Sequence, residues 1–143
     1  MTAPTVSEVR DALAAAISSR IPELNAYDTV PDVLQFPAMM VQPHTCDYLI
    51  GGGNCQDWTY KLLVMVPHTE GRANQEELDK FLSVTGEASI PAALKADYTL
   101  GLDGCDCTLL RMDGYGGSWE GLKGIGAAPH IGAQLYVRVI VTE

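Results

Sequence analysis

Basic residues are scarce in this sequence. Its 143 residues include nine Lys and Arg but 18 Asp and Glu, which gives a formal net charge of −9. Proteins that hold nucleic acid tightly do so through clusters of Lys and Arg that release counterions from the phosphates. We therefore expect no surface that grips nucleic acid, although an acidic wall could still face DNA without holding it.

Long hydrophobic runs are also missing. An apolar stretch such as Leu62–Pro67 is much shorter than the roughly 20 residues that a membrane helix needs. The chain begins Met1-Thr2-Ala3-Pro4-Thr5, without the basic start and apolar stretch of a signal peptide. We expect a protein with no membrane partner that is made and kept in a cytoplasm. A length of 143 residues suits a single domain, 1–143. Because 47% of the residues are apolar, we expect a folded rather than a disordered chain.

No pattern of catalytic, cofactor-binding or metal-binding residues stands out. His44, His68 and His130 are widely scattered, and we expect each of them to face solvent near a strand end or in a loop. The glycines at 51–53 are followed neither by Lys-Ser/Thr nor by a predicted helix, so they do not form a phosphate-binding loop. No pattern supports Cys46 and His68 as a nucleophile and its base. We therefore predict no catalytic residue, no cofactor, no metal and no enzymatic activity.

The four cysteines are Cys46, Cys55, Cys105 and Cys107. An even number predicts disulfides only in a secreted protein, and the secretion signal is missing here. Cys105 and Cys107 stand two residues apart on a predicted strand, so their side chains should point to the same face. We expect four buried or half-buried free thiols, with a metal site and a disulfide as alternatives.

Helical signals occur at three places. Thr5-x-x-Glu8 is a capping box before a helix that should end near Arg20, because Pro22 disfavours helix at the residue before it. A second helix is expected over Gly71–Leu82, with Leu78, Phe81 and Leu82 as its buried stripe. A short third helix, Ile90–Lys95, would begin after Ser89 as its N-cap.

Alternating patterns predict the strands. The clearest is Ile131–Val141, where apolar residues occupy nearly every second position. Pro43 within one predicted strand indicates a sheet edge or a bulge, since proline cannot donate to the ladder. The fold class is therefore α+β, with two main helices on one face of a four- to five-stranded antiparallel sheet and the order α-β-β-β-α-α-β-β. The expected strands are Ala26–Val30, Ala38–Cys46, Trp58–Val66, Cys105–Met112 and Ile131–Val141.

Two hairpins carry long loops, Asp47–Asp57 and Gly114–His130. Connections in small domains usually have about 4–6 residues, and longer loops are often functional. The second loop is rich in glycine around a single tryptophan, Trp119. Trp119 either folds back onto its own sheet or anchors an interface, since Trp is enriched in binding hot spots.

The layout resembles the tail terminator (tail-completion) proteins of long-tailed phages, especially those infecting actinobacteria. The similarity spans nearly the whole chain and consists of soft patterns of common residues. The segments that carry it are Val6–Ala16 followed by Ile21-Pro22, Ala26–Asp32, Phe36-Pro37-Ala38, Trp58–Val66 leading into Arg72–Leu82, Ser89–Asp97 with Thr99-Leu100-Gly101, and the hairpin Tyr115–Val141.

The resemblance implies a non-enzymatic virion protein at the junction of tail and neck. Such a protein is expected to form a homo-hexameric ring that caps the tail tube, ends its polymerisation and provides the head-joining surface. Its partners would be itself, the major tail tube protein and a head–tail connector protein, while DNA passes through its channel without specific binding. The residues expected at subunit or partner interfaces are Tyr48, Trp58, Tyr115, Trp119, Leu122 and Ile125.

Two other functions stay open. One is another ring protein of the phage neck, such as a head-completion or connector subunit, which sequence does not easily separate from a tail terminator. A small ligand-binding module or enzyme is the other alternative, and it would need a deep pocket with perturbed titratable groups. Co-purification with the tail tube protein or with the connector would separate the first two.

Overall fold

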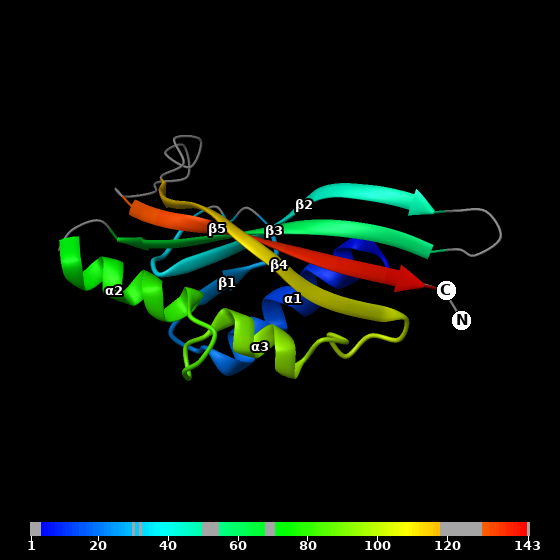
Figure 1. The fold of residues 1–143 in the computed structure, drawn as a ribbon, viewed down its shortest axis with the longest axis horizontal. Helices are drawn as coiled ribbons and strands as arrows, with labels where there is room; N and C mark the ends of the chain where they lie inside the picture. The colour runs from blue at the N-terminus through cyan, green and yellow to red at the C-terminus, as the bar shows by residue number, and fades with distance from the viewer. Residues whose placement is uncertain are drawn as a thin grey trace.

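The computed structural model describes residues 4–29, 31, 33–49, 55–67, 71–117 and 130–142. The elements follow the predicted order α-β-β-β-α-α-β-β (Figure 1). They are α1 (Val6–Arg20), β1 (Asn25–Tyr27), β2 (Ala38–Leu49), β3 (Cys55–Pro67), α2 (Gly71–Leu82), α3 (Ile90–Ala96), β4 (Cys105–Gly117) and β5 (His130–Thr142). The α+β fold class is therefore confirmed.

The five strands form one sheet in the order β1-β2-β3-β5-β4. All neighbouring strands are antiparallel except β1 and β2, which pair in parallel from Asn25 opposite Ala38 to Tyr27 opposite Met40. The sheet is thus mixed rather than wholly antiparallel. Strand β2 begins beside the first residue of β1, with Ala38 opposite Asn25, so the two strands run in the same direction.

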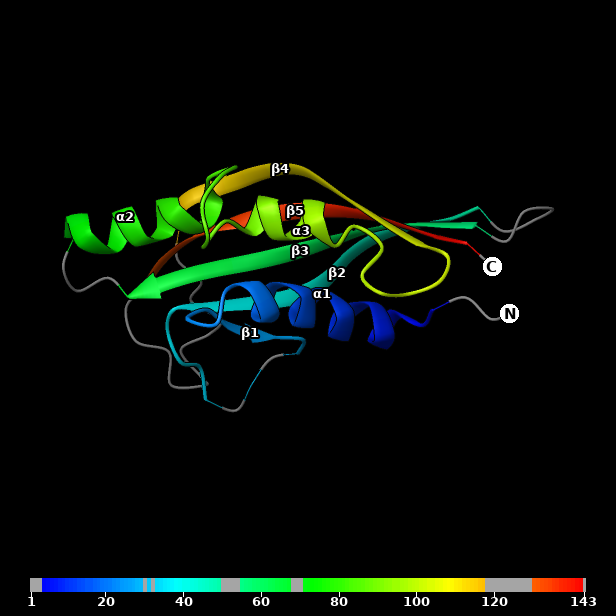
Figure 2. The ribbon, with the colours of Figure 1, turned by 90° about the horizontal axis from the view of Figure 1, so that it is seen from below.

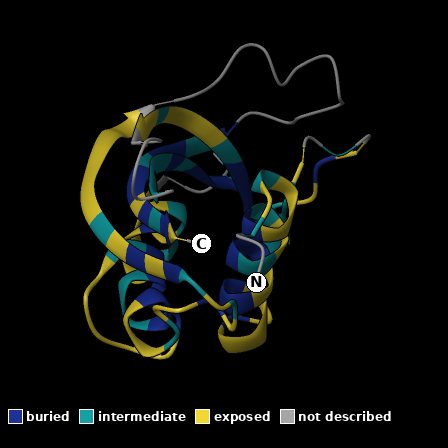
Figure 3. Ribbon diagram, turned by 90° about the vertical axis from the view of Figure 1, so that its right-hand side faces the viewer, coloured by how far each residue is buried: buried dark blue, intermediate teal, exposed yellow. Residues whose placement is uncertain are grey.

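The helices cover one face of the sheet (Figure 2). The capping box is confirmed, because the Thr5 hydroxyl accepts from the Glu8 amide and the Glu8 carboxylate accepts from the Thr5 amide. The resulting helix α1 buries Val9, Leu13 and Ile17 against the sheet. Phe81 of α2 belongs to the same apolar cluster, which is the main core. Figure 3 shows buried residues on both the helices and the strands, and a long exposed stretch of β4 at the margin.

A second, smaller core lies on the other face of the sheet. Leu63 and Met65 of β3 are buried there with Met40, and Leu34 and Phe36 from the segment before β2 pack against them. The chain's own segment before β2 therefore covers Leu63 and Met65.

The strands of both hairpins are longer than the sequence predicts. Asp47 pairs with Asp57, and the ladder of β2 and β3 continues to Leu49 opposite Cys55. The first connection is therefore residues 50–54, which is an ordinary length. Strand β4 continues through Gly117, so only residues 118–129 separate it from β5. Acidic residues in the first hairpin and glycines in the second interrupt the apolar alternation at these strand ends, which is why alternation did not reveal them.

The bulge expected at Pro43 is present. The register of β2 against β3 shifts between Pro43 and Thr45, so His44 is the extra residue. A second irregularity lies in β4 between Leu109 and Arg111. Each bulge adds local twist to a strand at the margin of the sheet.

Candidate interaction surface

Two of the predicted interface residues lie side by side on the β2–β3 hairpin. Tyr48 and Trp58 meet edge to face with ring centroids 6.0 Å apart, and Trp58 stacks on Tyr60 at 5.8 Å. Trp58 is only half-exposed, packs against the main core, and donates its indole N–H to the Gln56 side chain at 2.9 Å. Tyr48 is 61% exposed. Trp58 thus helps to support the ring of Tyr48, which is the accessible member.

Tyr115 lies elsewhere on the molecule, at the far end of β4 over α2 (Figure 1). Its hydroxyl donates to the Asp79 carboxylate at 2.5 Å. That hydrogen bond, together with partial burial, raises the pKa of Tyr115. The structure therefore does not bring Tyr115 together with Tyr48. Trp119, Leu122 and Ile125 lie outside the described residues.

The sheet has two open edges. Strand β1 covers β2 only as far as Met40, and no described strand lies beyond β2 from Val41 to Leu49. Strand β4 forms the other edge, and there the Cys107 amide donates to the Tyr98 carbonyl at 2.8 Å. Open edges present unpaired backbone groups to any strand that approaches. Leu110 and Met112 of β4 are exposed beside that edge.

An apolar groove follows the β4 edge on the helix side of the sheet. We call it the α3–β4 groove; its volume is about 510 Å³. Tyr98 stands at its rim and is 55% exposed. The lining residues are Pro91, Leu94, Lys95, Tyr98, Asp106, Cys107, Thr108 and Leu109.

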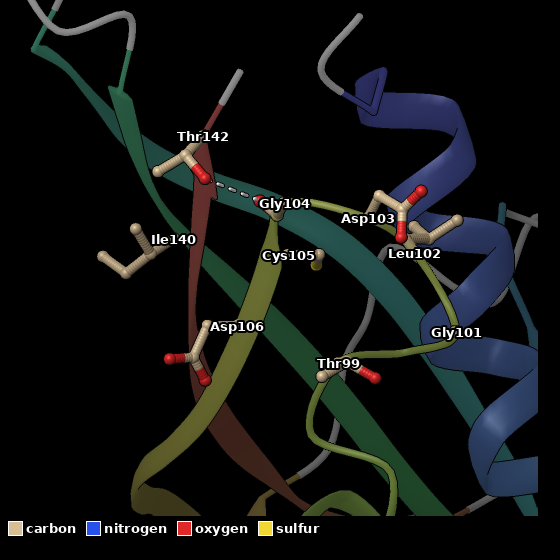
Figure 4. Close-up of a pocket in the computed structure, with 9 residues that line it drawn as sticks. All are labelled: Thr99, Gly101, Leu102, Asp103, Gly104, Cys105, Asp106, Ile140 and Thr142. Carbon is tan, nitrogen blue, oxygen red and sulfur yellow. Dashed lines mark hydrogen bonds between the residues drawn. The ribbon is translucent and has the colours of Figure 1, made fainter. Parts of the chain in front are cut away.

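A second hollow of about 640 Å³ opens at the start of β4 (Figure 4). It is lined by the loop after α3 and by the end of β5, where the Thr142 amide donates to the Gly104 carbonyl at 2.8 Å. Its two acids, Asp103 and Asp106, are well separated. Burial raises the pKa of the Cys105 thiol here to about 11. A thiol with such a pKa stays protonated at neutral pH and is a poor nucleophile.

The thiols are placed as expected. Cys105 and Cys107 are buried in the main core, Cys46 and Cys55 are half-buried, and all four are free. Within the described part of the chain, no three His, Cys, Asp or Glu side chains gather where they could hold a metal ion. No helix of that part is long and apolar enough to cross a membrane.

The histidines differ from expectation at one position. His44 is exposed as predicted and lies against the Tyr136 ring at 5.4 Å. His130 is buried, with its ring 5.4 Å from that of Phe36, so the prediction of a solvent-facing side chain is wrong there. The segment before β2 folds over the start of β5, and no local pattern predicts that contact. His68 lies outside the described residues.

The face of the sheet away from the helices is mainly polar from Asp57 to Lys61 of β3 and at the neighbouring positions of β5 and β4. Register places Lys61, Tyr136 and Arg111 side by side across three strands, with the Arg111 guanidinium 4.2 Å from the Tyr136 ring centre. Arg138 makes a bidentate pair with Asp57 at 3.0 and 2.7 Å, and this contact lowers the pKa of Asp57. Several of the few basic residues therefore gather on one face of an acidic protein.

Tyr48 as an interface residue stays a prediction. Sequence reasoning indicated an edge or a bulge at Pro43 but did not predict the α3–β4 groove. Tyr98 and Leu94 belong to α3 and the turn after it, and they meet β4 only through the tertiary fold. The adjacent leucines Leu109 and Leu110 break the alternation of β4 and could have indicated its bulge. No known family model matches the chain, and no curated protein matches its sequence.

Proposed function

We propose that this chain is a phage tail terminator, a structural ring subunit that caps the tail tube and provides the head-joining surface. The observation that supports this most is the pair of sheet edges without a further described strand, β2 beyond Met40 and β4 apart from the Cys107 amide, which donates to Tyr98. A protein with two different free edges can add copies of itself head to tail.

Strand directions favour such addition. Each of the pairs β2–β3, β3–β5 and β5–β4 is antiparallel, so β4 runs opposite to β2. A second copy related by rotation about an axis along the strands would therefore offer its β2 antiparallel to β4. Head-to-tail contacts of this kind generate a ring when the rotation closes. The sequence resemblance supplies the number six and the place at the tail end.

Charge is consistent with a DNA channel. The net charge of −9 would repel passing phosphates rather than trap them. The proposed function needs no catalytic group.

The test is the length and completeness of tails in a phage that carries the chain and in the same phage with its gene disrupted. We expect over-long tails that fail to join heads in the disrupted phage, and rescue by the chain supplied in trans. Image averages of assembled tails should show a six-fold ring at the tube end. Tails of normal length that lack only the connector would instead support a neck ring protein, and a symmetry other than six or three would contradict the proposal.

A further inference from the structure

Tyr48 lies on the helix side of an open edge. It pairs across the ladder with Gln56, so it shares a face with Trp58 and Tyr60, and Tyr60 is buried in the main core under the helices. Yet Tyr48 itself is 61% exposed. The described residues thus leave a large aromatic ring largely uncovered beside unpaired backbone of β2.

The α3–β4 groove lies on the same side of the sheet, at the opposite edge. Its apolar lining comes from Pro91, Leu94 and Tyr98 on the helix side and from Leu109 on β4. Lys95 and Asp106 in the lining offer a donor and an acceptor. Such a site fits a side chain with a flat apolar body and one polar tip, which is what a tyrosine offers.

Tyr48 and the groove also stand at the same level along the strands. Tyr48 is opposite Gln56, Gln56 is opposite Val141, and Val141 is opposite Cys105. The nearest strand residue of the groove is Asp106, one residue further along β4 and about 3.4 Å away along the strand. A second copy added edge to edge, without a shift along the strands, would therefore bring its Tyr48 beside the groove.

We infer that Tyr48 of one copy docks in the α3–β4 groove of the next copy. The β2 edge of the first copy then pairs with the β4 edge of the second beyond Cys107, whose amide already donates to Tyr98. This inference rests on the proposed ring and names the joint between its subunits. The occupant is a second copy because the two edges are antiparallel, the ring and the groove face the same side, and their levels match. Backbone pairing gives the joint its direction, and the tyrosine ring gives it its register.

The first experiment is photo-crosslinking with p-benzoylphenylalanine in place of Tyr48. Copies with light and heavy nitrogen are mixed, so that crosslinks between copies can be distinguished by mass. We expect crosslinks between copies that end in residues 91–98 or 106–109. The same probe in place of Val84, which is 76% exposed, is the matched control and should not label these segments. Crosslinks only within one copy, or only to other segments, would overturn the inference.

The second experiment measures self-association by sedimentation. Tyr48→Ala should weaken it at least about 30-fold, the effect of losing a hot spot. Tyr48→Phe keeps the ring but loses the polar tip, so it should weaken association less than Tyr48→Ala does. Val84→Ala should have no effect, and melting curves would show that each variant is folded. A parent chain that stays monomeric up to about 1 mM, or equal association of Tyr48→Ala and Val84→Ala, would contradict the joint.

The two proposals fail separately. Normal tails in the disrupted phage would contradict the terminator function. Crosslinks from Tyr48 to the α3–β4 groove would still support the proposed contact between copies. Crosslinks outside the groove would remove the joint, and over-long tails would still support the terminator function.

Discussion

At the scale of single residues, the buried thiols Cys105 and Cys107 and the phenol of Tyr60 are the most strongly perturbed titratable groups among the described residues. Burial is the main cause that raises the pKa of Cys107 from 9.0 to about 12, and the neighbouring Cys105 adds to it. Burial also raises the pKa of Tyr60. These groups stay protonated in the folded chain at pH values where their unfolded counterparts already lose a proton.

We expect stability to fall as the pH rises above 9. Because the folded pKa of Cys107 is raised, its contribution to the free energy of unfolding is complete below the unfolded pKa of 9.0. That contribution is lost as the pH rises from 9.0 to the folded pKa of about 12. One pH unit above the unfolded pKa, Cys107 should contribute a loss of about 1 kcal/mol. Urea unfolding at pH 8 and pH 10 measures this loss.

Cys107→Ala is the variant that assigns the effect. It costs some packing at every pH, but its stability should fall less steeply between pH 8 and pH 10 than that of the parent. Val84→Ala, a change at an exposed residue without a titratable group, serves as the control and should keep the parent slope. Equal slopes for the parent and Cys107→Ala would show that this thiol is not held protonated by the fold.

At the scale of elements, the connection from α3 to β4 depends on two glycines with positive φ. Gly101 has φ of 67° and no atom within 4 Å of the place where a Cβ would stand. Gly104 has φ of 74°, and a Cβ there would stand 2.2 Å from the Thr142 carbonyl oxygen. Backbone atoms of β5 cannot move aside without breaking the ladder, so the two glycines should respond differently to the same change.

Gly101→Ala should cost about 1 kcal/mol of folding free energy, the strain of a left-handed conformation in a residue with a Cβ. Gly104→Ala should cost about 2 kcal/mol more, because overpacking against backbone is added to the same strain. Chemical denaturation of the two variants measures the difference. Equal losses would mean that β4 and β5 separate at this end at little cost.

At the scale of the whole molecule, charge is unevenly spread. The face of the sheet away from the helices carries three basic residues, Lys61, Arg111 and Arg138. The chain as a whole has a net charge of −9. Asp57 offsets Arg138 directly, and Arg111 rests on Tyr136. This face is therefore a small basic area within an acidic surface rather than an extended nucleic-acid groove.

We expect no saturable binding of duplex DNA below roughly 10 μM at physiological salt, because few phosphates could be neutralised at once. Fluorescence anisotropy with a labelled duplex tests this. Lys61→Glu should give the same flat titration as the parent. Submicromolar binding with a steep salt dependence, lost in Lys61→Glu, would show that the face of the sheet away from the helices binds DNA.

The local patterns of the sequence determined much of the fold. The capping box at Thr5 and Glu8 set the start of α1, and the alternation in Ile131–Val141 set the two faces of β5. The alternation in Trp58–Val66 of β3 likewise placed Tyr60 and Leu62 on one face and Leu63 and Met65 on the other. These features are local, because helix caps and strand faces depend on residues only a few positions apart.

Contacts between distant segments decided the rest. The parallel pairing of β1, the burial of His130 beside Phe36, and the cover over Met65 all depend on where the segment before β2 folds back. The sequence pointed to Tyr48 as an interface residue, but the groove proposed to receive it exists only because α3 packs beside β4. Short-range patterns determine the type of each element and which of its faces is buried. Sheet edges, grooves and the alignment of residues across strands arise only when the elements pack together. The proposed contact between copies depends on these tertiary features.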